Sequence, residues 1–139
     1  MAGAICWCPG VASAQAIDVV ELTVDQIQAA YAAGEYTAVE LTRAYLDRIE
    51  LYEEHYNAFI SMNADALLVA AELDEQYVAA GPVGPLHGVP VVIKDNIDQA
   101  GQVTTAGFDG FSGATGGIDM IPDDNAAVVD RLRAAGAII

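Results

Sequence analysis

The stretch Leu86–Asn96, LHGVPVVIKDN, organises the chain, because this run of β-branched residues carries the only lysine among the 139 residues. A short apolar run bounded by Gly and Pro is typical of a strand that is buried on both faces. Alternation places Val92 and Lys94 on one side and Val91 and Ile93 on the other. Desolvation would lower the pKa of such a lysine from about 10.4 and make the amine a usable base near neutral pH. Spacing alone leaves open an ordinary lysine that extends from the strand end into water.

Several segments resemble the amidase signature family. The opening block of that family resembles Gly84–Asp98 (GPLHGVPVVIKDNID) and Thr104–Gly107 (TTAG). Its next block resembles Asp124–Val129 (DNAAVV) and Leu132–Ile139 (LRAAGAII). The resemblance extends from about Leu22 to the last residue.

The resemblance implies the N-terminal part of a hydrolase that cleaves carboxamide C–N bonds through a Ser-Ser-Lys triad. In this family a nucleophilic serine passes its proton through a second serine, held by a cis peptide bond, to an unprotonated lysine. Lys94 falls on the position of that lysine and is the predicted catalytic residue. Ser13, Ser61 and Ser112 do not match the Gly-Ser-rich block that holds both family serines. We therefore expect the isolated chain to be inactive, with a small carboxamide as substrate of the whole enzyme and no cofactor or metal.

Two alternatives stay open at this stage. The chain could instead be a non-catalytic fragment that acts only as a structural or interaction module, and the coding region beyond Ile139 would distinguish the two. The substrate also stays open, because the family includes enzymes for free amides, fatty amides, peptide amides and the glutamine used for transamidation of tRNA. No substrate-binding residue is predicted.

Acidic residues dominate the charge of the chain. It has 20 Asp and Glu against 5 Lys and Arg, which gives a formal net charge of -15. Such a surface repels phosphate backbones and anionic lipid headgroups, so we expect neither nucleic acid nor a membrane surface as a partner. No apolar run approaches the roughly 18 residues of a membrane span. Because 54% of the residues are hydrophobic, we expect apolar surface to be buried against protein, which includes contacts in a homo-oligomer.

Residues 1–21 are predicted to form an N-terminal tail. Cys6 and Cys8 lack the second pair that a zinc site needs. Met1–Ala16 is apolar and contains small-residue cleavage patterns, but it has no Lys or Arg for the start of a signal peptide. The segment weakly resembles the end of a signal peptide, so a cytoplasmic and an exported location both stay open.

The predicted fold class is α/β, with residues 22–139 as the N-terminal part of an amidase-like domain. A helical arm at 22–80 precedes the start of a mixed, helix-flanked sheet at 84–139, and the Gly- and Pro-rich stretch Gly81–Pro85 separates them. Capping-box spacing predicts a helix over about Val24–Ala33 and a longer one after Thr37.

Further elements follow from the same local signals. Asn63 is predicted to cap a third helix that ends at Gly81, with an extended connector or short strand before it. In the second half we expect a core strand over about Val89–Lys94 and a helix over about Ala126–Ala135, with a further strand starting at Ala137.

Three features near these elements could have a function, but each also has an ordinary structural interpretation. Asp95 and Asp98 could bind a metal, but loop acids are common, and we expect Asp95 to act on Lys94 through its charge. The six glycines of 101–117 match no phosphate-binding pattern and indicate a flexible or substrate-bordering loop. His55, at a predicted helix end, is expected to lie at the surface or interact with the helix dipole.

Overall fold

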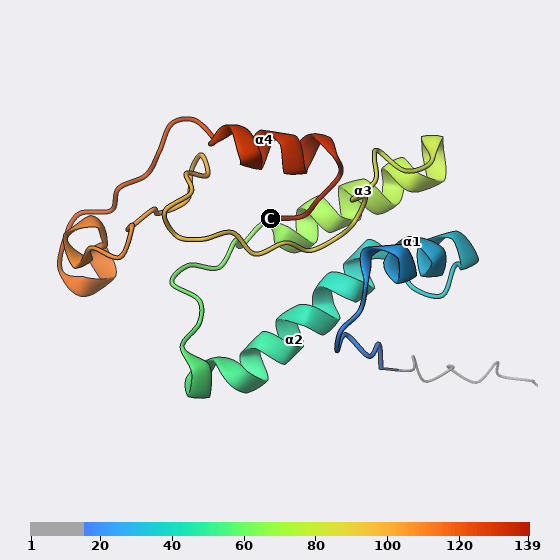
Figure 1. Cartoon of the computed structure of the whole chain (residues 1–139), viewed down its shortest axis with the longest axis horizontal. Helices are drawn as coiled ribbons and strands as arrows, with labels where there is room; N and C mark the ends of the chain where they lie inside the picture. Colours follow the sequence, from blue (N-terminus) through green and yellow to red (C-terminus); the bar gives the residue numbers. More distant parts are fainter. Residues whose placement is uncertain (1–15) are drawn as a thin grey trace, which may run out of the picture.

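The computed structural model describes residues 16–139, so the predictions for Cys6, Cys8 and the apolar segment before Ala16 lie outside the described residues. The described part contains the α-helices α1 (Val24–Ala33), α2 (Ala38–Tyr56), α3 (Ala66–Ala80) and α4 (Ala127–Ala134). Two short 3-10 helices, η1 (Asp109–Phe111) and η2 (Gly113–Thr115), lie in the loop before α4. In Figure 1, α4 lies on one side of the extended segments near the C-terminus, and α2 lies on the other.

The first two helices begin where their capping boxes predict. The Thr23 hydroxyl accepts a hydrogen bond from the backbone N–H of Gln26, whose side chain accepts one from Thr23 N–H. Thr37 and Glu40 make the same reciprocal pair at the start of α2. These bonds satisfy N–H groups that a helix start leaves without partners. The prediction of both helices is confirmed.

The N-terminus of α2 has a second cap, which comes from another helix. Asp74 of α3 accepts hydrogen bonds from the backbone N–H groups of Ala38 (2.7 Å) and Val39 (3.0 Å). A carboxylate at this place satisfies two free donors and compensates the positive end of the helix dipole. Asp74 thereby fixes α3 against α2.

The later helices depart from the prediction in detail. The N-cap of α3 is Asp65, without a side-chain cap hydrogen bond, so the prediction of Asn63 as the cap was wrong. The Asn63 side chain instead accepts from Asp65 N–H and donates to the backbone oxygen of Ile139. The predicted helix over about Ala126–Ala135 is confirmed as α4, which spans Ala127–Ala134.

The predicted strands are not present among residues 16–139. The two extended segments run parallel, with Ile138 N–H donating to Val89 O and Val91 N–H donating to Ile138 O, but they form one isolated bridge, Pro90 to Ile138. Pro90 has no N–H to donate, and a strand needs consecutive bridges. The prediction of burial on both faces was also wrong for this chain, because Val92 is 71% exposed. The alternation itself is correct, since Val91 and Ile93 are half-buried while Val92 and Lys94 are exposed.

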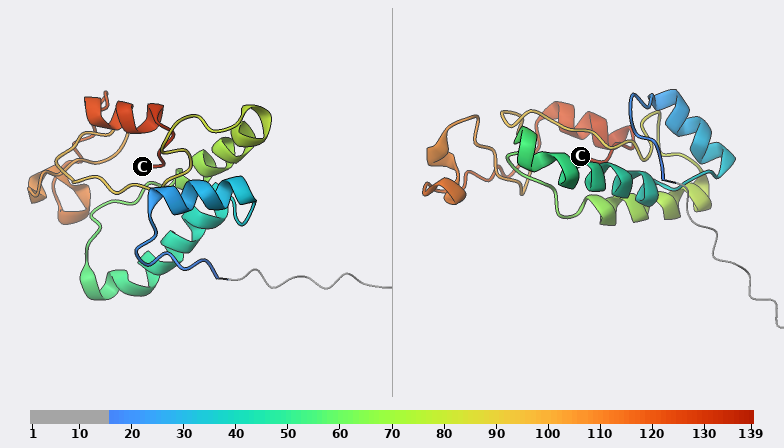
Figure 2. Two further views of the ribbon diagram at one scale, coloured as in Figure 1. Left: turned by 45° about the vertical axis from the view of Figure 1, so that its right-hand side comes forward. Right: turned by 90° about the horizontal axis from the view of Figure 1, so that it is seen from below.

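One hydrophobic core joins the helical arm to the extended segments. Its buried members come from both parts of the chain: Ile27, Tyr31, Ala38, Leu41, Ala66, Ala70, Val89 and Ile138. On α3, Val69 and Leu73 pack against this core, whereas Val78 is 89% exposed. Figure 2 shows the extended segments between α4 and the layer formed by the other helices.

The loop before α4 extends away from these helices (Figure 1). Its base is closed by Gly101 N–H to Pro122 O and Thr104 N–H to Met120 O. At its tip, Phe108 and Phe111 make an edge-to-face contact with ring centroids 5.1 Å apart. The loop has internal order, and its two ends return to the end of the motif that carries Lys94.

Candidate active site

Lys94 lies in the wall of an open groove of about 500 Å³. One wall is α2, another is the connector at 58–63 between α2 and α3, and a third is the extended pair Pro90–Asp95 and Ile138–Ile139. Gln102, Val103 and Thr104 border the groove near the base of the long loop. The predicted catalytic lysine therefore faces a space shared by both halves of the chain.

Extended backbone sets the direction of Lys94. Val91 is hydrogen-bonded to Ile138, and the regular alternation that follows puts Ile93 inward and Lys94 outward. The Lys94 carbonyl accepts a hydrogen bond from Ile97 N–H (2.9 Å), which turns the chain after the lysine. Lys94 is an exposed residue that lines the groove, so it is accessible to groups that enter the groove.

The Asp95 carboxylate binds the TTAG segment. Its Oδ1 accepts from Thr105 N–H (3.0 Å), and its Oδ2 accepts from the Thr105 hydroxyl and from Gly107 N–H (3.2 Å). Partial burial raises the pKa of this carboxyl, but the hydrogen bonds from Thr105 and Gly107 and the charge of Lys94 outweigh it, so the pKa of Asp95 is lowered. Asp95 is therefore ionised at neutral pH and carries a negative charge next to Lys94 in the sequence.

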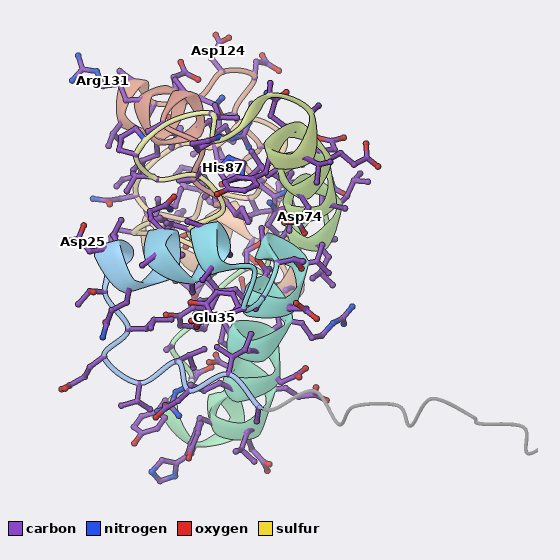
Figure 3. All side chains as sticks on the ribbon, turned by 90° about the vertical axis from the view of Figure 1, so that its right-hand side faces the viewer. Asp25, Glu35, Asp74, His87, Asp124 and Arg131 are labelled. Atoms are coloured by element: carbon purple, nitrogen blue, oxygen red, sulfur yellow. The ribbon has the colours of Figure 1, made fainter. Side chains whose placement is uncertain are left out.

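The sequence analysis missed His87 as a buried polar residue. It is 1% exposed and packs against the rings of Tyr31 and Tyr77. Figure 3 labels His87 together with Asp74 of α3. Its Nδ1 accepts a hydrogen bond from Val83 N–H, which requires Nδ1 to be unprotonated. Burial lowers the pKa of His87, with Asp74 partly opposing the shift. The signal was a polar residue between Leu86 and Gly88 inside an apolar stretch, and its role here is packing.

One polar atom in the groove wall has no partner. Thr42 on α2 is 3% exposed and lines the groove, and its hydroxyl makes no hydrogen bond among the described residues. Leaving a buried hydroxyl unsatisfied costs about 1–3 kcal/mol. The groove wall therefore offers a hydroxyl for a hydrogen bond, and no sequence signal distinguished Thr42 from an ordinary helix residue.

Of the two serines in the described part of the chain, Ser61 lines the groove, whereas Ser112 lies in the long loop at the end of η1. His55 is exposed in the last turn of α2, as predicted. Asp98 accepts a hydrogen bond from Ala126 N–H through its backbone oxygen. Residues 16–139 contain no group of three or more His, Cys, Asp or Glu side chains that could hold a metal ion.

A helix that crosses a membrane must be both long and apolar. Among the described helices none combines the length and the apolar character needed to cross a membrane.

Known proteins resemble most of this chain. A glutamyl-tRNA(Gln) amidotransferase subunit of Chloroflexus aurantiacus is 45% identical over 119 residues, which are 85% of this chain and 23% of the relative. The structure of a peptide amidase from Stenotrophomonas maltophilia superposes with a TM-score of 0.75 at 38% identity, over 86% of this chain and 24% of that one. An amidase family protein from Bacillus anthracis gives a TM-score of 0.74 at 31% identity, over 86% of this chain and 23% of its own.

The similar structures also indicate the fold class and how much of each relative this chain covers. The neighbouring structures are amidase-signature folds of the α/β class, and this chain spans about a quarter of the length of the relatives it matches. The family model described as Amidase matches residues 40–139, which include Lys94, Asp95 and the groove walls formed by the extended pair. The chain belongs to the amidase signature family.

Proposed function

We propose that this chain supplies the general base, Lys94, to the active site of an amidase-signature hydrolase that cleaves carboxamide C–N bonds. The nucleophilic serine and the second serine of the Ser-Ser-Lys triad would come from polypeptide outside these 139 residues. The observation that carries the proposal is that Lys94, the sole lysine, lies in the family motif and faces the groove.

The chemistry assigned to Lys94 is transfer of one proton. In its neutral form the amine accepts the proton that leaves the nucleophilic serine by way of the second serine, while the serine oxygen attacks the carboxamide carbon. The ammonium then returns the proton toward the leaving amine, and water repeats the cycle on the acyl-enzyme. For this role the second serine must come within about 2.6–3.2 Å of Lys94 Nζ. The exposure of Lys94 along the groove leaves room for such an approach.

Replacement of Lys94 in the complete enzyme that contains this sequence tests the proposal. Lys94→Ala should lower kcat/KM on a simple carboxamide by about 10²-fold to 10⁴-fold or more, the usual contribution of a general base. Lys94→Arg should be nearly as damaging, because a guanidinium keeps the charge but does not release its proton at working pH. Arg131→Ala removes an equal charge from the exposed face of α4 and serves as the matched control.

The outcomes separate the base from a surface lysine. Circular dichroism first establishes that each variant is folded. A folded Lys94→Ala enzyme that keeps more than about a tenth of the wild-type activity would remove the base assignment, given the usual size of that contribution. Loss of activity in Lys94→Ala with full activity in Lys94→Arg would assign Lys94 an electrostatic role instead.

A second candidate is amide transfer. It is favoured by the 45% identity to a glutamyl-tRNA(Gln) amidotransferase subunit. In such a reaction the nucleophilic serine would attack the side-chain amide of glutamine and release ammonia for transfer to an acceptor, and water would hydrolyse the acyl-enzyme to glutamate. The net charge of -15 makes this chain a poor surface for tRNA. Glutaminase activity that requires a second protein component would favour transfer, whereas hydrolysis of simple carboxamides by the single protein favours the amidase.

A further inference from the structure

We propose that Asp95 and Thr105 position Lys94, because the Asp95 carboxylate clamps the end of the Lys94 segment to the loop Thr104–Gly107. This inference rests on the proposed role of Lys94 as the base. Neither Asp95 nor Thr105 transfers a proton in this scheme. Their role is to fix where the lysine side chain starts and to keep one negative charge beside it.

The backbone around Lys94 needs such a clamp. The parallel pairing with Ile138 ends at Val91, so hydrogen bonds to the neighbouring segment do not hold the three residues that follow. The next hydrogen bonds along the chain are the one that Ile97 N–H donates to the Lys94 carbonyl and those that the Asp95 side chain accepts. The three donors on that carboxylate come from residues ten and twelve positions later in the sequence. Asp95 therefore ties the lysine to a second, distant segment.

Local strain in the loop is consistent with this role. Ala106, between the two residues that donate to Asp95, has a φ of 50°, a left-handed conformation that costs an alanine free energy and persists where surrounding contacts enforce it. The Ala106 N–H points to the Asp95 backbone oxygen at 3.4 Å, while the residues on either side bind the carboxylate. The loop is thus folded around Asp95.

The charge state of the clamp is set by the same contacts. Hydrogen bonds to the carboxylate favour its ionised form, and Lys94 is the charged neighbour that acts on it. Across the pH range in which a lysine base would operate, Asp95 is ionised and all three hydrogen bonds are available. The carboxylate that makes the clamp therefore keeps its charge in that range.

A hydroxyl deletion with a matched rescue tests the proposal in the complete enzyme. Thr105→Val keeps the side-chain volume but removes the hydroxyl donor, whereas Thr105→Ser keeps the donor. We expect Thr105→Val to lower kcat by about 10-fold to 100-fold, since small displacements of a catalytic group have effects of this size, with KM changed far less. Thr105→Ser should restore kcat to near the wild-type value.

A control in the same loop separates positioning from loop stability. The Thr115 hydroxyl donates to Asp109 O (2.7 Å) and Ser112 O (3.0 Å) and does not touch Asp95. Thr115→Val should therefore leave kcat unchanged. Equal kcat in Thr105→Val and wild type, or equal losses in Thr105→Val and Thr115→Val, overturns the positioning role. If Lys94→Ala also retains activity, the proposed function fails; if it does not, only the positioning role fails.

A spectroscopic measurement on the complete enzyme gives an independent result. The Gly107 backbone amide should follow the titration of Asp95 in ¹⁵N spectra, because it donates a hydrogen bond to the Asp95 carboxylate. In Thr105→Val the midpoint of this transition should rise, because the carboxylate loses its hydroxyl donor, while Thr105→Ser and Thr115→Val should match wild type. A Gly107 amide that does not respond to the Asp95 titration, or an unchanged midpoint in Thr105→Val, overturns the clamp.

Discussion

Replacing Gly88 with alanine should destabilise the chain through two separate effects. Gly88 has a φ of 69°, a left-handed conformation that costs an L-residue about 1–2 kcal/mol. A Cβ at this position would lie 2.8 Å from Cε2 and 2.9 Å from Oη of Tyr31, and 3.0 Å from Cβ of Ala38. The tyrosine cannot move away without loss, because its hydroxyl donates to the Gly88 backbone oxygen at 2.8 Å.

The magnitude follows from comparison with Gly34. Gly34 has nearly the same φ, 68°, but a Cβ there would meet nothing within 4 Å. Gly34→Ala should therefore cost only the backbone strain, about 1–2 kcal/mol of unfolding free energy. Gly88→Ala should cost about 1–3 kcal/mol more for overpacking, because both neighbours are buried. Out of a typical total of about 5–15 kcal/mol, the difference between the two variants is measurable.

Urea unfolding of both variants, followed by circular dichroism, measures this difference. The midpoint of Gly88→Ala should fall clearly below that of Gly34→Ala, with similar slopes. Unfolding free energies that agree within about 0.5 kcal/mol would refute the reasoning, since surface substitutions without special features vary by that amount. Such a result would mean that Tyr31 and Ala38 relax around the new methyl group at no cost.

Two further predictions concern the contacts between helices and the motif. Asp74→Ala should lower the unfolding free energy by about 1–3 kcal/mol in urea unfolding, because the N–H groups of Ala38 and Val39 lose a charged acceptor; a cost below about 0.5 kcal/mol would show that water replaces the carboxylate. His87 should make stability depend on pH: its pKa is lowered in the folded chain, so below about pH 6.5 the unfolded chain takes up a proton that the folded chain does not, and stability falls on acidification. In thermal unfolding between about pH 7 and pH 5, His87→Asn should remove much of this dependence of stability on pH, whereas a variant of the exposed histidine, His55→Asn, should retain it. If stability depends on pH equally in wild type and His87→Asn, His87 is not the origin of the dependence.

Local signals in the sequence predicted the helices well. The capping boxes at Thr23 and Thr37 act over three residues, so their hydrogen bonds can be recognised without any knowledge of the rest of the fold. The family motif around Lys94 likewise lies within one continuous stretch. For the same reason, the placement of Val92 and Lys94 on one side of the run and of Val91 and Ile93 on the other was predicted correctly.

Contacts between distant segments were not predictable in this way. Asp74 caps a helix 35 and 36 residues earlier, and His87 is buried by Tyr31 and Tyr77 from two different helices. The hydrogen bonds of Asp95 to Thr105 and Gly107 likewise depend on how the long loop folds back. No local pattern distinguishes Asp74 and Asp95 from ordinary surface Asp residues, and the apolar stretch around His87 does not reveal which residues pack against it.

The predicted sheet also shows the difference between what local sequence determines and what contacts between distant segments determine. By itself, the sequence determined the helices and the extended character of the apolar run, since both depend on the preferences of neighbouring residues. Whether an extended run becomes a strand depends on the hydrogen-bond partners beside it, and here the tertiary structure provides a single bridge at Pro90. The tertiary structure also decided which side chains lie beside Lys94, because the groove is formed by segments that are far apart in the sequence.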